Sequence, residues 1–261
     1  MSAAERWRED LAGWAIPGEI LAQAPQSPWI HPVAMFTVGD DIPDSPSHQL
    51  AREALPPGGS VLDVGCGGGR AAMAVSDRAG LVVGVDHQQR MLDEFAAAAE
   101  RRGCPHREVL GDWPESSADC PACDIVVVHH VLFNVSEPVE FLTALNRHAR
   151  HRVVIELPDR HPLSWMNPLW QRFWGLARPS GPRADDLVAV AHEAGLPAHI
   201  RHWYDVPATS RTPVSPQERV AFCRIRLCLP EERDPEVAAA LDELDTSGPR
   251  ATATIWWDVD P

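Results

Sequence analysis

Two histidines and a glycine-rich segment are the residues of this chain whose types and spacing could do chemistry. His129 and His130 follow an apolar run at 125–128, and an imidazole that titrates near neutral pH can take a proton from a hydroxyl or an amine. The glycine-rich segment, residues 65–69, follows another apolar run at 61–64. Glycines allow positive φ angles and let a ligand approach the backbone closely. These features predict a ligand site with a candidate proton acceptor.

These residues must be positioned by helices and strands. From about residue 48 to 158, apolar runs alternate with helical patterns, and this alternation predicts those elements. We expect helices at 71–79, 91–101 and 137–150, and strands at 61–64, 81–85, 106–110, 125–128 and 152–157. This alternation predicts a parallel sheet with helices on both faces. In such sheets ligands bind in the crevice at the carboxyl ends of the strands. Both the glycines and the histidines would lie at that edge.

The spacing of the glycines separates two kinds of nucleotide site. The dinucleotide pattern G-x-G-x-x-G, started at Gly65, would need a glycine where Arg70 stands. The segment instead reads D-x-G-x-G-x-G, with Asp63 two residues before the first glycine. On these residues the sequence resembles a class I S-adenosylmethionine-dependent methyltransferase, whose first motif matches Asp63, Gly65, Gly67 and Gly69. The resemblance covers about 48–158 and extends through the strand pattern to 261.

The resemblance implies an α/β fold with a doubly wound, mostly parallel seven-stranded sheet and helices on both faces. It also implies the cofactor S-adenosylmethionine and its product S-adenosylhomocysteine (SAH). Asp86 ends the second strand, where a carboxylate can accept both ribose hydroxyls, and Asp112 with Trp113 follows the third strand, where the family contacts the adenine. The expected cofactor-binding residues are Asp63, Gly65, Cys66, Gly67, Gly69, Asp86, His87, Asp112, Trp113 and His129.

The candidate catalytic residues are His130 and His129. Methyl transfer is an in-line displacement, so the protein mainly aligns the reacting atoms and excludes water. A base helps where the acceptor loses a proton. Neighbouring side chains of a strand point to opposite faces, so the two histidines cannot be equally placed. We prefer His130 as the base and a backbone contact to the cofactor for His129. A metal held by the pair with Glu156 or Asp159 is the alternative, and we expect none.

The expected acceptor pocket lies between the N-terminal arm and the insertion after the fifth strand, where this family usually builds it. Both segments are rich in tryptophan, and aromatic walls with a few polar groups suit a small, partly apolar molecule. Packing of the insertion onto the sheet is the alternative for the tryptophans. We expect four side chains to contact the acceptor: Trp29, His31, Asn134 and Trp165. Three arginines could bind an acceptor carboxylate or lie solvated at the surface: Arg160, Arg172 and Arg178.

The composition excludes several classes of protein. The 261 residues carry a formal charge of −14, and all 23 basic side chains are arginine. Without lysine there is no lysine-containing phosphate loop and no Schiff-base lysine. The acidic balance argues against nucleic acid or an anionic membrane as a partner. The charged N-terminus does not resemble a signal peptide, and no run reaches the roughly 18 apolar residues of a membrane span. We therefore expect a cytoplasmic protein.

The chain is expected to hold an arm and one domain. Residues 1–47, rich in proline, predict an N-terminal arm or lid over the active site. Residues 48–261 would form the S-adenosylmethionine-binding domain, with a tryptophan-rich insertion at about 159–180 and a helical insertion at about 215–245. We expect methyl transfer to an O or N atom of a small molecule in bacterial specialised metabolism, by a monomer or homodimer. A methyltransferase acting on protein or RNA, or a non-catalytic relative that binds the cofactor, is the alternative.

Overall fold

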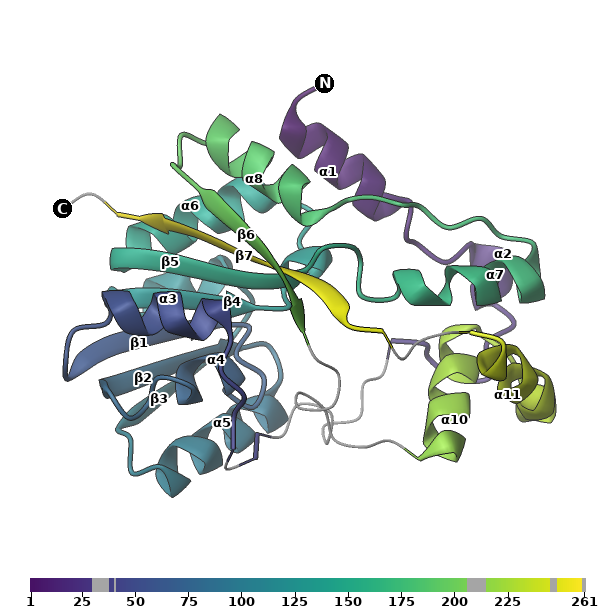
Figure 1. Ribbon diagram of the computed structural model, residues 1–261, viewed down its shortest axis with the longest axis horizontal. Coiled ribbons are helices and arrows are strands. Elements are labelled where there is room, and N and C mark those ends of the chain that lie inside the picture. Colours follow the sequence, from purple (N-terminus) through teal and green to yellow (C-terminus); the bar gives the residue numbers. More distant parts are fainter. Residues whose placement is uncertain (30–37, 40, 206–214, 245–247, 260–261) are drawn as a thin grey trace.

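The computed structural model describes residues 1–29, 38–39, 41–205, 215–244 and 248–259. A seven-stranded sheet with the strand order β3-β2-β1-β4-β5-β7-β6 lies at its centre (Figure 1). The strands are β1 (Gly59–Val64), β2 (Ala79–Asp86), β3 (His106–Leu110), β4 (Cys123–His129), β5 (Ala149–Pro158), β6 (His199–Asp205) and β7 (Arg250–Asp258). The pairs among β1 to β5 are parallel, and β7 runs antiparallel to both β5 and β6. The predicted fold class is therefore confirmed.

The faces of the sheet are covered by two separate groups of helices. One group packs around the buried Trp7 and Phe141 and consists of α1 (Ala3–Ala12), α6 (Pro138–His148) and α8 (Ala184–Glu193). The other packs around Phe95 and consists of α3 (Pro46–Ala54), α4 (Arg70–Met73) and α5 (Gln89–Arg101). Residues 125–128 of β4 are almost fully buried, as expected for a parallel strand covered on both faces.

A third group of helices has its own apolar cluster, beyond the ends at which the parallel strands finish (Figure 1). Trp170 and Leu227 are buried in this cluster, and the indole of Trp174 donates a hydrogen bond to the Leu227 carbonyl at 2.7 Å. The group consists of α2 (Gly18–Leu21), α7 (Asn167–Trp174), α10 (Pro216–Arg226) and α11 (Asp234–Asp242). It joins part of the N-terminal arm to both predicted insertions. None of the described helices is long and apolar enough to cross a membrane.

One predicted helix is shorter in the structure, and one helix of the structure was not predicted. The helix predicted at 71–79 ends at Met73 as α4. The chain turns early because Gly80, in β2, packs directly on the Gly58 backbone, where a Cβ would lie 2.4 Å from the carbonyl oxygen. The helix α3 was not expected, since its first residue, Pro46, was counted with the proline-rich arm. Proline at the first position of a helix is favourable, however, and Ser45 accepts a hydrogen bond from the backbone N–H of His48.

The first part of the predicted arm belongs to the packed layer over the sheet. Trp7 of α1 is fully buried, its ring stacks on Phe133 at 5.7 Å, and its indole N–H donates to the Val135 carbonyl at 2.9 Å. These contacts fix α1 next to the segment that follows β4. Short 3-10 turns complete the described chain: η2 (Glu115–Asp119), η3 (Leu132–Asn134), η4 (Ser164–Met166) and η5 (Glu231–Arg233).

Candidate active site

The loop between β1 and α4 needs its glycines. Gly65, Gly67 and Gly69 have φ angles of 66°, 50° and 89°, in the left-handed region that favours glycine. A Cβ on Gly65 would lie 2.5 Å from Cγ2 of Val131, in the segment that follows β4. The loop therefore lies directly against the end of β4, and only glycine allows this approach.

Asp63 supports this loop from below. Its side chain is buried, and its carboxyl accepts a hydrogen bond from the backbone N–H of Ala72 in α4 at 3.0 Å. Burial raises the pKa of Asp63 to about 8, because a charged carboxylate loses its hydration there. The structure thus places Asp63 where it can hold the start of the helix, with almost no surface exposed for a direct contact to a ligand.

Asp86 ends β2 beside the glycine loop, and its carboxylate can accept further hydrogen bonds. One carboxylate oxygen accepts from the backbone N–H of Gly67 at 3.0 Å, and the other accepts from that of Gln88 at 2.9 Å. A carboxylate offers about four lone-pair sites, so about two remain. Its position matches that of an acid which binds ribose hydroxyls at the end of the second strand.

His129 and His130 differ sharply in exposure. His129 is the last residue of β4, and 6% of its side chain is exposed, against 51% for His130. The chain turns between them, since His130 has a φ angle of 62° and its N–H donates to the Glu156 carbonyl at 2.7 Å. The turn presents only His130 to the crevice side of the sheet edge, in agreement with the unequal placement expected from the sequence.

Glu156 of β5 connects the two histidines. Its Oε1 lies 3.3 Å from Nε2 of His130 and 3.8 Å from Nδ1 of His129, while its Oε2 accepts from the Ser45 hydroxyl at 2.9 Å. Burial on its own raises the pKa of Glu156, but the imidazoles of His129 and His130 outweigh it and hold this pKa well below its usual range. Glu156 is therefore an ionised carboxylate that can orient the His130 ring.

His48 of α3 packs on His129 from the other side. The two rings stack with their centroids 5.4 Å apart, and none of their four nitrogens has a hydrogen-bond partner among the described residues. Burial lowers the pKa of His129 to about 3 and lowers that of His48 as well. At neutral pH both rings are thus uncharged and packed, which leaves His130 as the histidine of this cluster that meets solvent.

A cavity of about 360 Å³ opens near this edge of the sheet. Phe133 and Asn134, a few residues past His130, form part of its wall. The other walls come from the end of α1 and the segment after it, from the segment after β5 and from the third helix group: Leu11, Ala12, Trp14, Ala15, Ile16, Trp29, His161, Leu163, Trp170, Arg178 and Arg226. The cavity is largely apolar and aromatic, as small-molecule sites usually are.

Comparison with known proteins adds the decisive observation. Residues 61–152, which include the glycine loop, Asp86, both histidines and the strands between them, match the family model of a methyltransferase domain. This segment of the chain is a class I methyltransferase domain. The predicted family and enzyme class are confirmed for it, and with them S-adenosylmethionine, the methyl donor of that class.

Solved structures share the fold of the methyltransferase at low sequence identity. The YcgJ protein of Bacillus subtilis is 18% identical, with a TM-score of 0.54 over 82% of this chain and 98% of that one. Magnesium protoporphyrin IX methyltransferase of Synechocystis PCC 6803, with bound SAH, is 15% identical, with a TM-score of 0.51 over 82% and 80%. No curated protein matches the chain. These likenesses support the seven-stranded fold.

The remaining predicted cofactor residues of the methyltransferase fall into two groups. Cys66 and His87 flank the loop and Asp86. The Cys66 thiol is buried, which raises its pKa well above the usual value, and Nδ1 of the exposed His87 lies 3.6 Å from the Asp86 carboxylate. Asp112 is exposed at the end of β3, next in the sheet to Asp86. The loop, Asp86 and its spare lone pairs fit an adenosine cofactor.

Trp113, which was expected beside the adenine, packs against α6. Its ring meets His148 edge-on at 5.0 Å, and its indole N–H points to the Phe141 carbonyl at 3.4 Å. Both partners belong to α6, so the indole packs against a helix that covers the sheet. The contact holds the end of β3 in place.

The predicted acceptor residues are only partly brought together. Trp29 and Asn134 line the cavity. Trp165 packs with the third helix group and not onto the sheet, and His31 lies outside the described residues. The cavity wall also includes Arg178, one of the three arginines considered for an acceptor carboxylate. Other wall residues lie in separate segments, which no spacing in the sequence links: Trp14, Phe133 and His161.

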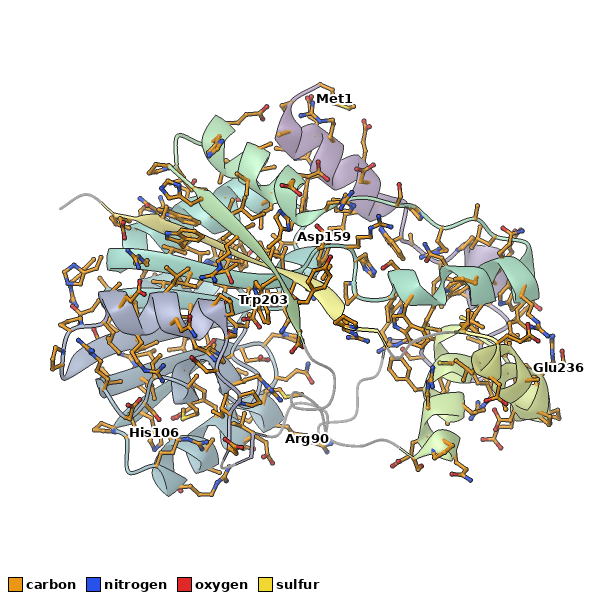
Figure 2. All side chains as sticks on the ribbon, viewed as in Figure 1. Met1, Arg90, His106, Asp159, Trp203 and Glu236 are labelled. Atoms are coloured by element: carbon orange, nitrogen blue, oxygen red, sulfur yellow. The ribbon has the colours of Figure 1, made fainter. Side chains whose placement is uncertain are left out.

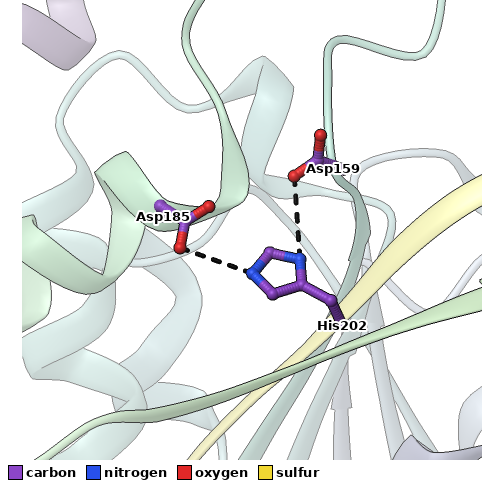
Figure 3. Close-up of side chains that lie close together, drawn as sticks. All are labelled: Asp159, Asp185 and His202. Atoms are coloured by element: carbon purple, nitrogen blue, oxygen red, sulfur yellow. Dashed lines mark hydrogen bonds and ion pairs between the residues drawn. The ribbon is translucent and has the colours of Figure 1, made fainter.

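A second polar cluster lies at the end of β5, where it meets α8 and β6 (Figures 2 and 3). His202 has its Nδ1 3.7 Å from Asp159 and its Nε2 3.4 Å from Asp185. The Arg183 guanidinium donates to the Asp159 carboxylate at 2.7 Å, and so balances its charge. Asp159, one of the two acids considered with the His129–His130 pair, thus faces His202 instead. The contacts tie α8 and β6 to β5.

Proposed function

We propose that this methyltransferase transfers its methyl group to an oxygen or nitrogen atom of a small molecule bound in the cavity. The observation that carries the proposal is the aromatic cavity of about 360 Å³, whose wall includes Phe133 and Asn134, three and four residues past His130. A concave apolar site of this size suits a small molecule. An extended, positively charged surface, which RNA would need, is not what the lining residues provide.

Binding of the cofactor is assigned to the loop and to Asp86. S-adenosylmethionine, when bound, supplies a methyl group already activated for displacement. The glycines at 65, 67 and 69 let it approach the backbone, and the free lone pairs of Asp86 would accept its ribose hydroxyls. The protein's main contribution is then to align the acceptor and exclude water.

His130 is the proposed base for an acceptor that loses a proton. Its Nε2 faces the Glu156 carboxylate at 3.3 Å, and a ring nitrogen that donates to a carboxylate leaves the other nitrogen, here Nδ1, unprotonated and able to accept. Glu156 acts through His130 as a positioning residue, and the Ser45 hydroxyl holds Glu156 in turn. This arrangement extends the sequence prediction, which named the histidines alone.

The arm and the setting complete the proposal. Trp14 and Trp29, in the described part of the arm that follows α1, line the cavity, which supports a role of residues 13–29 as part of a lid. We further propose the setting expected from the sequence, a cytoplasmic bacterial enzyme of specialised metabolism. It would act as a monomer or homodimer, with no nucleic-acid or membrane partner.

The test of cofactor binding is calorimetry with SAH. The wild-type protein is expected to bind it, and Asp86→Ala is expected to weaken binding by about 1–3 kcal/mol, because ribose hydroxyls lose their acceptor. Asp93→Ala, which removes an exposed acid of α5, is the matched control and should leave the affinity unchanged. Equal affinity of the Asp86→Ala variant and the wild type would contradict the ribose assignment.

Transfer itself is tested by SAH release from S-adenosylmethionine over a panel of hydroxylated and amino-substituted small molecules. Turnover with at least one of them is expected. Binding of SAH without turnover on the small molecules, but with methylation of a protein or RNA substrate, would overturn the small-molecule assignment. Binding without transfer to any of these acceptors would favour a non-catalytic relative.

A further inference from the structure

The cavity combines aromatic walls with basic side chains. Two arginines, Arg178 and Arg226, are among its wall residues, and its described lining holds no aspartate or glutamate. This is unusual in a chain with a formal charge of −14. Arg178 is half-buried and no carboxylate of the described lining lies beside it, which favours an anionic ligand, because a charge taken out of water needs a partner of opposite sign.

Arg178 has a donor that lacks a partner within the described part of the chain. Two of its N–H groups donate to the backbone carbonyls of Ala15 and Trp14. A guanidinium has five N–H donors, and the Nε of Arg178 is buried without a hydrogen-bond partner among the described residues. Burial also lowers the pKa of Arg178. A buried donor of this kind is costly to leave unpaired, and a carboxylate in the cavity would pair it.

The other two candidate arginines lie elsewhere. Arg172 pairs with Glu243 at 2.7 Å, and both side chains are largely exposed. Arg160 is largely exposed as well and lies 3.9 Å from Asp159 at the second polar cluster. Neither is part of the cavity wall. The structure thus selects Arg178 from the three arginines that the sequence offered for an acceptor carboxylate.

The surfaces around Arg178 are flat rings. Its guanidinium lies 5.3 Å from the ring centroid of Trp14 and 5.0 Å from that of Trp170. His161 stacks on Trp14 at 3.9 Å with an interplanar angle of 12°, and Phe133 meets His161 at 5.6 Å. Burial, helped by Arg178, lowers the pKa of His161 to about 4, so this ring is neutral at pH 7. These rings already pack on one another, and the parts of them that line the cavity form an uncharged aromatic wall, which favours contact with a planar aromatic ligand.

We propose that the acceptor is a planar aromatic acid, whose ring lies among Trp14, Phe133 and His161 and whose carboxylate pairs with Arg178. The inference rests on the proposed function, because it takes this cavity as the acceptor site, and it specifies the class of acceptor. Selectivity for the acid over a neutral analogue comes from the unpaired donor of Arg178. Selectivity for the planar ring over a saturated one comes from the aromatic walls.

The first experiment compares three probes on the wild-type protein by calorimetry in the presence of SAH. The probes are 6-hydroxy-2-naphthoate, its primary amide 6-hydroxy-2-naphthamide, and the saturated acid 6-hydroxydecahydro-2-naphthoate. The naphthoate is expected to bind at least tenfold more tightly than either of the others, since a hydrogen bond to a charged group is typically worth tenfold or more. Equal binding of the amide, or no binding of the naphthoate, would overturn the proposal.

The second experiment locates the recognition at Arg178. Arg178→Gln is expected to lose at least tenfold in affinity for the naphthoate and to leave the amide unchanged, so that the preference for the acid disappears. Arg178→Lys, which keeps the charge but loses the planar fork, should retain part of the preference and covers the case in which the first variant unfolds. Arg172→Gln is the matched control and should keep the full preference. An Arg178→Gln variant that folds and still prefers the acid contradicts the assignment.

The titration with SAH distinguishes failure of the acceptor assignment from failure of the proposed methyltransferase function. Binding of SAH together with equal binding of acid and amide would remove the inference about the acceptor and leave the methyltransferase proposal intact. Binding of the naphthoate without binding of SAH would contradict the proposed function while keeping the cavity as a site for aromatic acids. Thermal unfolding of each variant, measured alongside, shows whether a lost affinity reflects lost folding.

Discussion

At the scale of single residues, the adjacent histidines His129 and His130 differ in exposure because their surroundings differ. His129 is buried against His48, and its pKa is lowered to about 3 by burial. The His130 side chain is exposed, because the backbone turns there to a positive φ angle. Glu156 lies between the two histidines and contacts His130 at 3.3 Å, and its pKa lies well below the usual range although burial alone would raise it. The site therefore contains one solvent-facing imidazole with a fixed carboxylate behind it.

His130→Ala is expected to lower kcat by about 10²–10⁴-fold, the usual contribution of a positioned base, with an acceptor that loses a proton. Affinity for SAH should not change, because the imidazole is not expected to hold the cofactor. Glu156→Gln should lower kcat less and leave KM near the wild-type value, since the amide can still occupy the place of the carboxylate. Both are checked by steady-state SAH release and by calorimetry with SAH.

The control for this pair is His199→Gln, which changes an exposed histidine of β6 and should keep its kcat. A His130→Ala variant with wild-type turnover would show that no base is needed at this position. An equal loss of SAH affinity in His130→Ala would instead indicate a role in cofactor binding, opposite to the role assigned here.

At the scale of elements, the glycine loop makes the sharpest demand on the sequence. Gly65→Ala would place a Cβ 2.5 Å from the Val131 side chain, at a φ angle of 66°. The clash and the backbone strain together are expected to lower the free energy of unfolding by about 2–4 kcal/mol and to abolish measurable binding of SAH. Urea unfolding and calorimetry check the two effects.

Two further variants test the cause. Gly18→Ala lies in α2, where a Cβ meets nothing within 4 Å, and should be neutral or slightly stabilising. Gly65→Ala combined with Val131→Ala removes the clash but keeps the φ angle, so it should recover part of the lost stability. Full stability of Gly65→Ala alone would mean that the loop can move away from β4 without cost.

The strands could be predicted from the sequence because each buried strand is a continuous apolar run. The run at 125–128 is one example, and the predicted order of strands and helices then led to the fold. Helix lengths were less accessible. Nothing in the alanine-rich run at 71–79 shows that Gly80 must pack on Gly58, and this long-range contact ends α4 early.

The cofactor side of the site could be predicted because its residues are close in sequence to the strand ends that carry them. Asp86 and the glycines need only the strand pattern. The acceptor side depends on packing between distant segments: Trp14 stacks on His161, and Arg178 reaches back to the Ala15 carbonyl. Such contacts leave no periodic signal. Glu156 was considered only as a metal ligand, since its hydrogen bond to Ser45 joins positions 111 residues apart.

At the scale of the whole molecule, burial shifts the pKa values of several side chains. It lowers those of three histidines and raises that of one aspartate. Burial lowers the pKa of His129 to about 3 and of His161 to about 4 and lowers that of His48. Below pH 6.5 the unfolded chain therefore binds more protons than the folded protein at these sites, and stability falls as the pH falls. Burial raises the pKa of Asp63 to about 8, so from about pH 4 to 8 the folded protein binds more protons there, and stability falls as the pH rises.

These opposing slopes predict a maximum of stability near pH 6.5. Below that pH the effect of the three histidines on the free energy of unfolding is larger than that of Asp63. Above it the histidine effect ends, while the effect of Asp63 continues to about pH 8. Urea unfolding at pH 5, 6.5 and 8 should show the maximum, with a slope of at most about 1.4 kcal/mol per pH unit on the alkaline side. Asp63→Asn should flatten the dependence of the free energy of unfolding on pH above pH 6.5, and His161→Phe should reduce the slope below it. The controls Asp77→Asn and His199→Gln change exposed positions and should leave both slopes unchanged. An alkaline slope that persists in Asp63→Asn would assign it to another group.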